Sequence, residues 1–213
     1  MTGLIYKDIV VLKKQLGYYM IFLVFYAAMA VMGMGAGIFG AMISLVGLVL
    51  PMSSIAYDEQ ARWDKFAVST PAGRAGVVGA KYLFTLAVVG GMTAVVVALM
   101  GALRLAGLLK ESVAELALTA LACAGAVLFM NSFTLPLLLK YGAEKSRSIS
   151  MGLFVIIFGG AFLGGMVLKS WGSLPAPPIW LLRALPGLLV LLVAGAFGAS
   201  YCIARGIYEK KEL

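Results

Sequence analysis

Residues 15–57 read QLGYYMIFLVFYAAMAVMGMGAGIFGAMISLVGLVLPMSSIAY and contain no Asp, Glu, Lys, Arg or His. A helix needs about 20 mostly apolar residues to cross the hydrocarbon of a bilayer. This run is long enough for two crossings, and its glycine-rich middle, Gly33 to Gly40, tolerates the backbone angles of a tight turn. The stretch therefore predicts a helical hairpin in a membrane.

The whole chain has the composition of a membrane protein. Of its 213 residues, 62% are hydrophobic and only 12% are charged, against about 25% charged in ordinary globular proteins. So few charges cannot cover a water-facing surface, which excludes a soluble domain, and the apolar fraction excludes a disordered chain. We predict an all-α integral membrane protein in which residues 1–213 form a single transmembrane domain.

The uncharged runs predict six transmembrane helices. Their ranges are 17–35, 39–57, 82–103, 116–139, 149–168 and 184–204. Before the first of them, apolar residues recur at helical spacing from Ile5 to Leu16, with Lys7 and Lys14 on the opposite face. We predict that residues 3–16 form an amphipathic helix in the membrane interface, with its cations near anionic lipid. A simple run-in to the first span is the alternative.

Positive residues cluster on one predicted side of the membrane. Only Arg104, Lys110, Lys169 and Arg183 fall on the other side; the remaining 13 of the 17 Lys and Arg residues share the side of both termini. Cytoplasmic loops carry this excess of positive charge, so both termini are predicted to be cytoplasmic. The net charge of +8 is therefore attributed to membrane topology, and no nucleic-acid partner is expected.

Motifs for ion coupling and catalysis are missing from the sequence. No predicted span has an ionisable residue in its middle, and the chain has no histidine, whereas ion-coupled carriers and proton relays depend on intramembrane ionisable groups. The glycines Gly35, Gly37 and Gly40 match the dinucleotide spacing, but they follow a membrane span rather than a strand. No P-loop occurs. We expect no catalytic residue, no metal and no cofactor in this chain, which is not an enzyme by itself.

Polar residues are sparse inside the predicted spans. Asn131, Ser132 and Thr134 form the densest group, just before Pro136. Such residues either bond to a neighbouring helix beside a proline kink or line a central cavity, and both interpretations stay open. Pro51 and Pro136 are candidate points at which helices bend at a cytoplasmic gate.

Two cytoplasmic loops hold the remaining candidates. The longer, residues 58–81, starts with a mixed-charge segment that contains Trp63 and Phe66. We predict a short amphipathic helix there that exposes its aromatic rings for docking of a protein, with a place in the membrane interface as the alternative. Thr70 and Pro71 then read as the start of a helix that leads into the third span. The second loop spans residues 140–147.

In these loops the sequence resembles the small ABC-2 type exporter permeases, in particular the permeases of phenol-soluble-modulin peptide exporters. The residues that carry the resemblance are Glu59, Trp63, Asp64, Pro71, Arg74, Lys81, Tyr82, Pro136, Lys140, Tyr141, Gly142, Glu144, Lys145 and Arg147. The resemblance implies a transmembrane subunit in a bacterial plasma membrane that pairs with a second permease subunit, identical or related. Two copies of a separate ABC ATPase would bind ATP and Mg²⁺ beneath it.

The resemblance also implies roles for the loop residues. ATPase docking and coupling would fall to Asp58, Glu59, Arg62, Trp63, Asp64, Phe66, Pro71, Arg74 and Lys81. A secondary cytoplasmic contact would involve Lys140, Tyr141, Glu144, Lys145 and Arg147. The implied cargo is an amphipathic peptide, such as a toxin or antimicrobial peptide, with lipid or drug efflux as the alternative. An energy-independent immunity or scaffold protein and an ion-coupled carrier are the competing classes.

Overall fold

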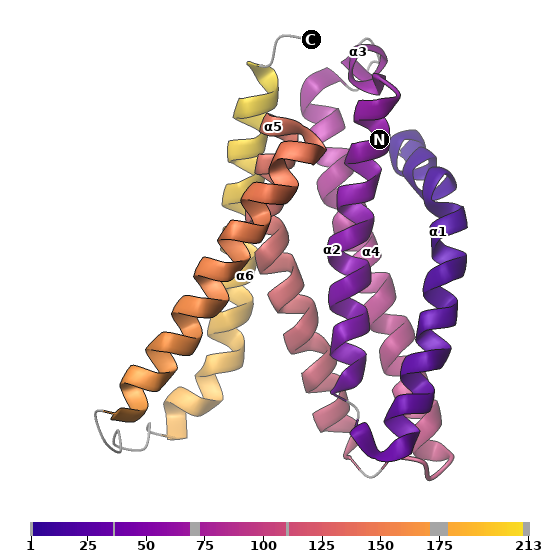
Figure 1. The fold of residues 1–213 in the computed structure, drawn as a ribbon, viewed down its shortest axis with the longest axis vertical. Helices are drawn as coiled ribbons and strands as arrows, with labels where there is room; N and C mark the ends of the chain where they lie inside the picture. Colours follow the sequence, from indigo (N-terminus) through magenta and orange to yellow (C-terminus); the bar gives the residue numbers. More distant parts are fainter. Residues whose placement is uncertain (1, 36, 69–72, 110, 171–178, 211–213) are drawn as a thin grey trace.

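The computed structural model describes residues 2–35, 37–68, 73–109, 111–170 and 179–210, and no strand occurs among them. The elements in chain order are α1 (Thr2–Met29), the π-helical turn η1 (Ala30–Met34), α2 (Ile38–Gln60), α3 (Trp63–Val68), α4 (Gly73–Leu105), α5 (Val113–Ser170) and α6 (Ile179–Glu209). The long helices stand roughly side by side (Figure 1). The predicted all-α architecture is confirmed for this part of the chain.

The predicted turn in the first uncharged run is present. Helix α1 continues into η1, and the chain then reverses into α2. Gly33 and Gly35 have φ angles of 102° and 74°, a region that residues with a Cβ rarely occupy. The glycines therefore close the hairpin that joins the first two long helices.

Helix α5 departs from the prediction of two helices joined by a loop. Its 58 residues would extend roughly 87 Å if straight, against about 30 Å of bilayer hydrocarbon. The helix instead breaks at Gly142, where φ is 80° and ψ is 172°. From this break the second arm runs back toward the end of the molecule from which the first arm came (Figure 1). The predicted loop over residues 140–147 is wrong, because one glycine with a positive φ reverses the chain without it.

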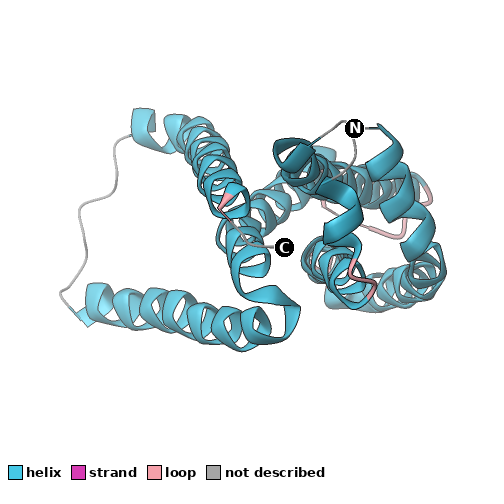
Figure 2. Ribbon diagram, turned by 90° about the horizontal axis from the view of Figure 1, so that it is seen from above, coloured by secondary structure: helices cyan, strands magenta, loops and turns pink. Residues whose placement is uncertain are grey.

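Five helices in the described part of the chain are long and apolar enough to cross a membrane. The N-terminal hairpin supplies two of them, α4 and α6 supply one each, and α5 counts as one although it has two arms. Both chain termini lie at the end of the molecule that also holds α3 and the break of α5 (Figure 1). The second arm of α5 and the start of α6 lean away from the other helices (Figure 2).

Two apolar clusters hold the helices together. The larger lies among α1, α2, α4 and the first arm of α5. At its centre are Phe39, Met42, Val89 and Val96, each at most 1% exposed, and the neighbouring Val127 is 2% exposed. Burying an apolar side chain of this size stabilises a water-soluble protein by about 1.5–3 kcal/mol, but in lipid the gain comes from close packing instead.

The smaller cluster lies nearer the end that holds the termini. It joins α2, α4, α5 and α6 through Ile55, Val78, Tyr82, Leu138 and Tyr208. The Tyr82 hydroxyl is 2.6 Å from Ser200 Oγ, so the only polar atom of this ring is satisfied inside the bundle. This cluster fixes the positions of the helix ends that form the candidate site.

Candidate functional site

Five segments from distant parts of the sequence meet at the end of the molecule that holds the termini. They are the start of α1, the end of α2, the short helix α3, the start of α4 and the break of α5 (Figure 1). Most residues that the sequence singles out for docking belong to these segments. The structure therefore brings together the loop 58–81 and the region around residue 142.

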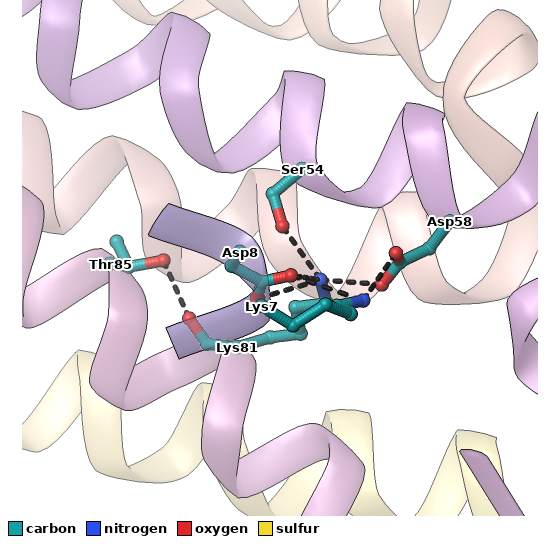
Figure 3. Close-up of polar contacts among 6 residues, drawn as sticks. All are labelled: Lys7, Asp8, Ser54, Asp58, Lys81 and Thr85. Carbon is teal, nitrogen blue, oxygen red and sulfur yellow. Dashed lines mark hydrogen bonds and ion pairs between the residues drawn. The ribbon is translucent and has the colours of Figure 1, made fainter. Parts of the chain in front are cut away.

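Four charged side chains form an ion-pair cluster at the centre of this end (Figure 3). Lys81 Nζ on α4 lies 2.9 Å from Asp8 Oδ1 on α1 and 2.6 Å from Asp58 Oδ2 on α2. Lys7 Nζ on α1 lies 2.5 Å from Asp58 Oδ1 and 3.2 Å from Asp8 Oδ1. Lys81 Nζ also donates a hydrogen bond to Ser54 Oγ at 2.6 Å. We call Lys7, Asp8, Asp58 and Lys81 the charge quartet.

Three members of the quartet are buried, Lys7 is partly exposed, and the four charges balance. Asp8 is 2% exposed, Lys81 6% and Asp58 9%. Removing one charge from water costs several kcal/mol unless a partner and hydrogen bonds compensate it. Here each carboxylate touches both ammonium groups, so the two positive and two negative charges cancel. This arrangement joins three helices.

The inward position of Lys7 corrects the prediction for the N-terminal segment. α1 is a continuous helix from Thr2 to Met29, and its inward face carries Asp8 and Leu12, which are 2% and 1% exposed. The expectation that Lys7 faces anionic lipid is wrong, because the carboxylate of Asp58 binds it. Ile9 on the predicted apolar face is 46% exposed, so a membrane surface at this face stays a prediction. A one-turn pattern of apolar residues could not show which face meets the protein.

Helix α3 covers only part of the mixed-charge segment at the start of loop 58–81, because α2 continues to Gln60. Phe66 is 65% exposed and presents its ring outward, as predicted. Trp63 is half-buried, and Lys7 Nζ lies 4.8 Å from its ring centroid, a cation–π distance. Its indole nitrogen is buried and meets no acceptor within the described residues. Trp63 thus attaches α3 to the quartet, and the ring of Phe66 lies 6.4 Å from that of Trp63, centroid to centroid.

Glu59 holds the break of α5. Its Oε2 accepts a hydrogen bond of 2.7 Å from the backbone N–H of Ala143, the first residue after Gly142. A carboxylate at this position satisfies a free N–H at the start of the second arm and interacts favourably with its helix dipole. A Cβ on Gly142 would lie 2.4 Å from Glu59 Oε1. The backbone conformation at residue 142 therefore favours glycine, and a Cβ there would force the Glu59 carboxylate to move.

The other predicted docking residues differ in their surroundings. Arg62 has a positive φ of 50° and joins α2 to α3, and the Arg74 guanidinium donates to the carbonyl of Glu209 near the end of α6. Pro71 lies outside the described residues, and of Asp64 only the backbone is described. The residues of the predicted secondary contact are exposed and lie on both sides of the α5 break. They are Lys140, Tyr141, Glu144, Lys145 and Arg147.

The polar residues within the helices make hydrogen bonds to backbone carbonyls. Asn131 is 1% exposed, and its Nδ2 donates to Gly47 O on α2 at 2.9 Å and to Val127 O at 3.0 Å. Ser132 and Thr134 donate to the carbonyl four residues earlier. Within this chain Asn131 is thus a helix contact. α2 and α5 continue through Pro51 and Pro136 without a break.

Sequence reasoning missed Lys7, Asp8, Ser54 and the role of Gly142. The chain has only nine acidic residues, and Asp8 and Asp58 both stand at helix ends on the side of the termini. Scarce acids beside basic residues on the same side are a signal for ion pairing, and a glycine between two predicted spans is a signal for a sharp reversal. Within the described residues no group of three His, Cys, Asp or Glu side chains is placed to hold a metal.

The comparison with family models gives one match, which covers nearly the whole chain. The model for "ABC-2 family transporter protein" matches residues 3–209. The matched range includes all five segments of the candidate site. No curated protein and no solved structure matches the chain.

Proposed function

The chain belongs to the ABC-2 transporter family, and from this premise we propose that it is the membrane-spanning permease subunit of an exporter driven by a separate ABC ATPase. The match across residues 3–209 is the observation that carries the proposal. The absence of a P-loop from the sequence supports the division of labour, because ATP and Mg²⁺ would then be bound by the partner.

We propose six membrane crossings, with the two arms of α5 counted separately. Each arm is of the length that one crossing needs, and the break at Gly142 lies at the same end as α3 and the termini (Figure 1). The basic residues of the sequence gather at this end, which supports a cytoplasmic position for it. A bacterial plasma membrane is the proposed location.

The proposed ATPase contact is the surface of α3 around Phe66. This ring is exposed at the end proposed to face the cytoplasm, and exposed aromatic rings are frequent anchors of protein interfaces. Behind it, Trp63 contacts Lys7 of the quartet, so α3 is attached to three long helices and is suited to pass on a movement of the ATPase. We propose two permease subunits and two ATPase copies in the complex, with the residues around the α5 break as the secondary contact.

The proposed cargo is hydrophobic or amphipathic. The helix surfaces that face away from the bundle are apolar, for example at Val155, Ile156, Phe162 and Leu163 on the second arm of α5, each more than 60% exposed. No ionisable group lies in the middle of a proposed span to select a charged solute. An amphipathic peptide fits this chemistry, and a lipid or drug is the second class of cargo.

Co-purification with the ABC ATPase encoded beside the chain tests the proposal. The matched variants are Phe66→Ala on α3 and Leu105→Ala, an exposed apolar residue at the far end of α4. We expect the wild type and Leu105→Ala to retain the ATPase and its hydrolysis of ATP, and Phe66→Ala to lose both while its thermal stability stays unchanged. A chain that purifies without ATPase would favour the immunity or scaffold class instead. Stimulation of hydrolysis by a synthetic amphipathic Leu/Lys peptide, but not by lipid, would identify the cargo class.

A further inference from the structure

Two neighbouring residues at the end of α2 bind two different parts of the molecule. Asp58 bonds to α1 and α4, whereas Glu59 bonds to the break of α5. We propose that Asp58 and Glu59 are a branch point that divides a movement of α3 between the α1–α4 side and the α5 side. This inference rests on the proposed function, because it assumes that the ATPase moves α3.

The geometry of an α-helix explains how adjacent residues on α2 reach different neighbouring helices. Successive side chains on a helix are separated by about 100° around its axis. The side chain of Asp58 therefore enters the quartet, where it meets Lys7 at 2.5 Å and Lys81 at 2.6 Å. The next side chain, Glu59, leaves the helix toward the N–H of Ala143, 2.7 Å away.

The connection from α3 to this pair is short. Only Ala61 and Arg62 separate α2 from α3, and the N–H groups of both donate to carbonyls of the last turn of α2, at Tyr57 and Glu59. A displacement of α3 thus acts first on the turn that carries Asp58 and Glu59. Trp63 adds a second connection on one side only, because it contacts Lys7.

Both polar and apolar contacts join the end of α2 to the neighbouring helices. A pocket of about 20 Å³ lies among Asp58, Glu59 and Lys81 and the apolar side chains of Ile55 and Leu138, which is room for about one water molecule. The apolar cluster holds these helix ends together. The ion pairs of Asp58 and the hydrogen bond of Glu59 add polar links, each of which joins α2 to one side only.

Separable loss of the two links is the test. Hydrogen exchange is measured on the purified complex of permease and ATPase, with and without ATP and vanadate, over residues 2–16 and 73–85 on one side and 140–150 on the other. The first variant is the double substitution Lys7→Met with Asp58→Asn, which keeps the remaining pair of Lys81 and Asp8 balanced and so preserves the fold. The second is Glu59→Ala, with Glu115→Ala as its control, because Glu115 is an exposed glutamate at the start of α5, far along the helix from the break.

We expect the double variant to lose the nucleotide-dependent change at residues 2–16 and 73–85 while it keeps the change at 140–150. Glu59→Ala should show the reverse, and Glu115→Ala should behave as the wild type. Variants that lose both responses together, or neither, would overturn the inference, as would a wild-type complex that hydrolyses ATP without a change on either side. A wild-type chain that binds no ATPase would instead refute the proposed function before any variant is compared.

Discussion

Replacing Gly142 by alanine tests the reversal of α5 most sharply. The backbone angles at this residue, φ 80° and ψ 172°, belong to a region that is essentially restricted to glycine and costs another residue about 1–3 kcal/mol. The new Cβ would also lie 2.4 Å from Glu59 Oε1 and 3.0 Å from Glu59 Cδ. Glu59 must then swing away and release the N–H of Ala143, a charge-assisted bond that we count at about 1 kcal/mol because the site is exposed. We expect Gly142→Ala to destabilise the protein by about 3 kcal/mol.

The assay is thermal unfolding of the purified protein in detergent. For a chain of this size the loss corresponds to a midpoint lowered by roughly 6–12 °C. Gly152→Ala on the second arm of α5 is the control, because open space surrounds that glycine and the midpoint should not fall. In a background of Glu59→Ala, Gly142→Ala should cost less by about the 1 kcal/mol of the lost bond. A Gly142→Ala protein as stable as the Gly152→Ala protein would refute the role of Gly142 in the reversal.

Three further substitutions test the contacts that hold the bundle together, each by thermal unfolding in detergent. Lys81→Met should destabilise the protein by about 3–5 kcal/mol, because it leaves two buried carboxylates short of a partner. The control Arg205→Gln removes an exposed ion pair and should leave the midpoint unchanged. Equal effects of the two variants would contradict the burial of the Lys81 ion pairs. Asn131→Ala should cost about 0.6–2 kcal/mol by removing an interhelical hydrogen bond, and a variant of full stability that alters transport would favour the cavity interpretation. Gly47→Ala should cost about 1–3 kcal/mol, because the new Cβ would lie 2.6 Å from a valine methyl on α5. Gly90→Ala, in open space, should be neutral. A Gly90→Ala protein less stable than the Gly47→Ala protein would contradict the close packing of α2 on α5.

Hydrophobicity alone predicted most of the fold. Long uncharged runs fixed where the long helices lie, since few other arrangements satisfy backbone polar groups in lipid, and the glycines from Gly33 to Gly40 predicted the first reversal. The second reversal was predicted as a loop because charged residues gather between 140 and 147. The structure shows that helix can extend past the apolar run, so charge marks the end of the hydrocarbon and not the end of the helix.

The site was only partly predictable, because its bonds join residues far apart in the sequence. The docking role of loop 58–81 stays a prediction, and within that loop the ring of Phe66 is exposed. The inward position of Asp58 and Lys81 depends on how α1 packs against α2 and α4, which no local pattern encodes. Their proposed contribution to coupling therefore acts through the quartet rather than through a surface that touches the ATPase.

Cross-linking from α3 tests the central claim, that this end of the protein receives the ATPase. A photoreactive residue is placed at position 66 on α3 or at position 105 at the far end of α4, in membranes that contain the chain and the ATPase encoded beside it. The account predicts a cross-link to the ATPase from position 66 and none from position 105. A cross-link from position 105 alone, or no cross-link from position 66 in a complex that hydrolyses ATP, would contradict it.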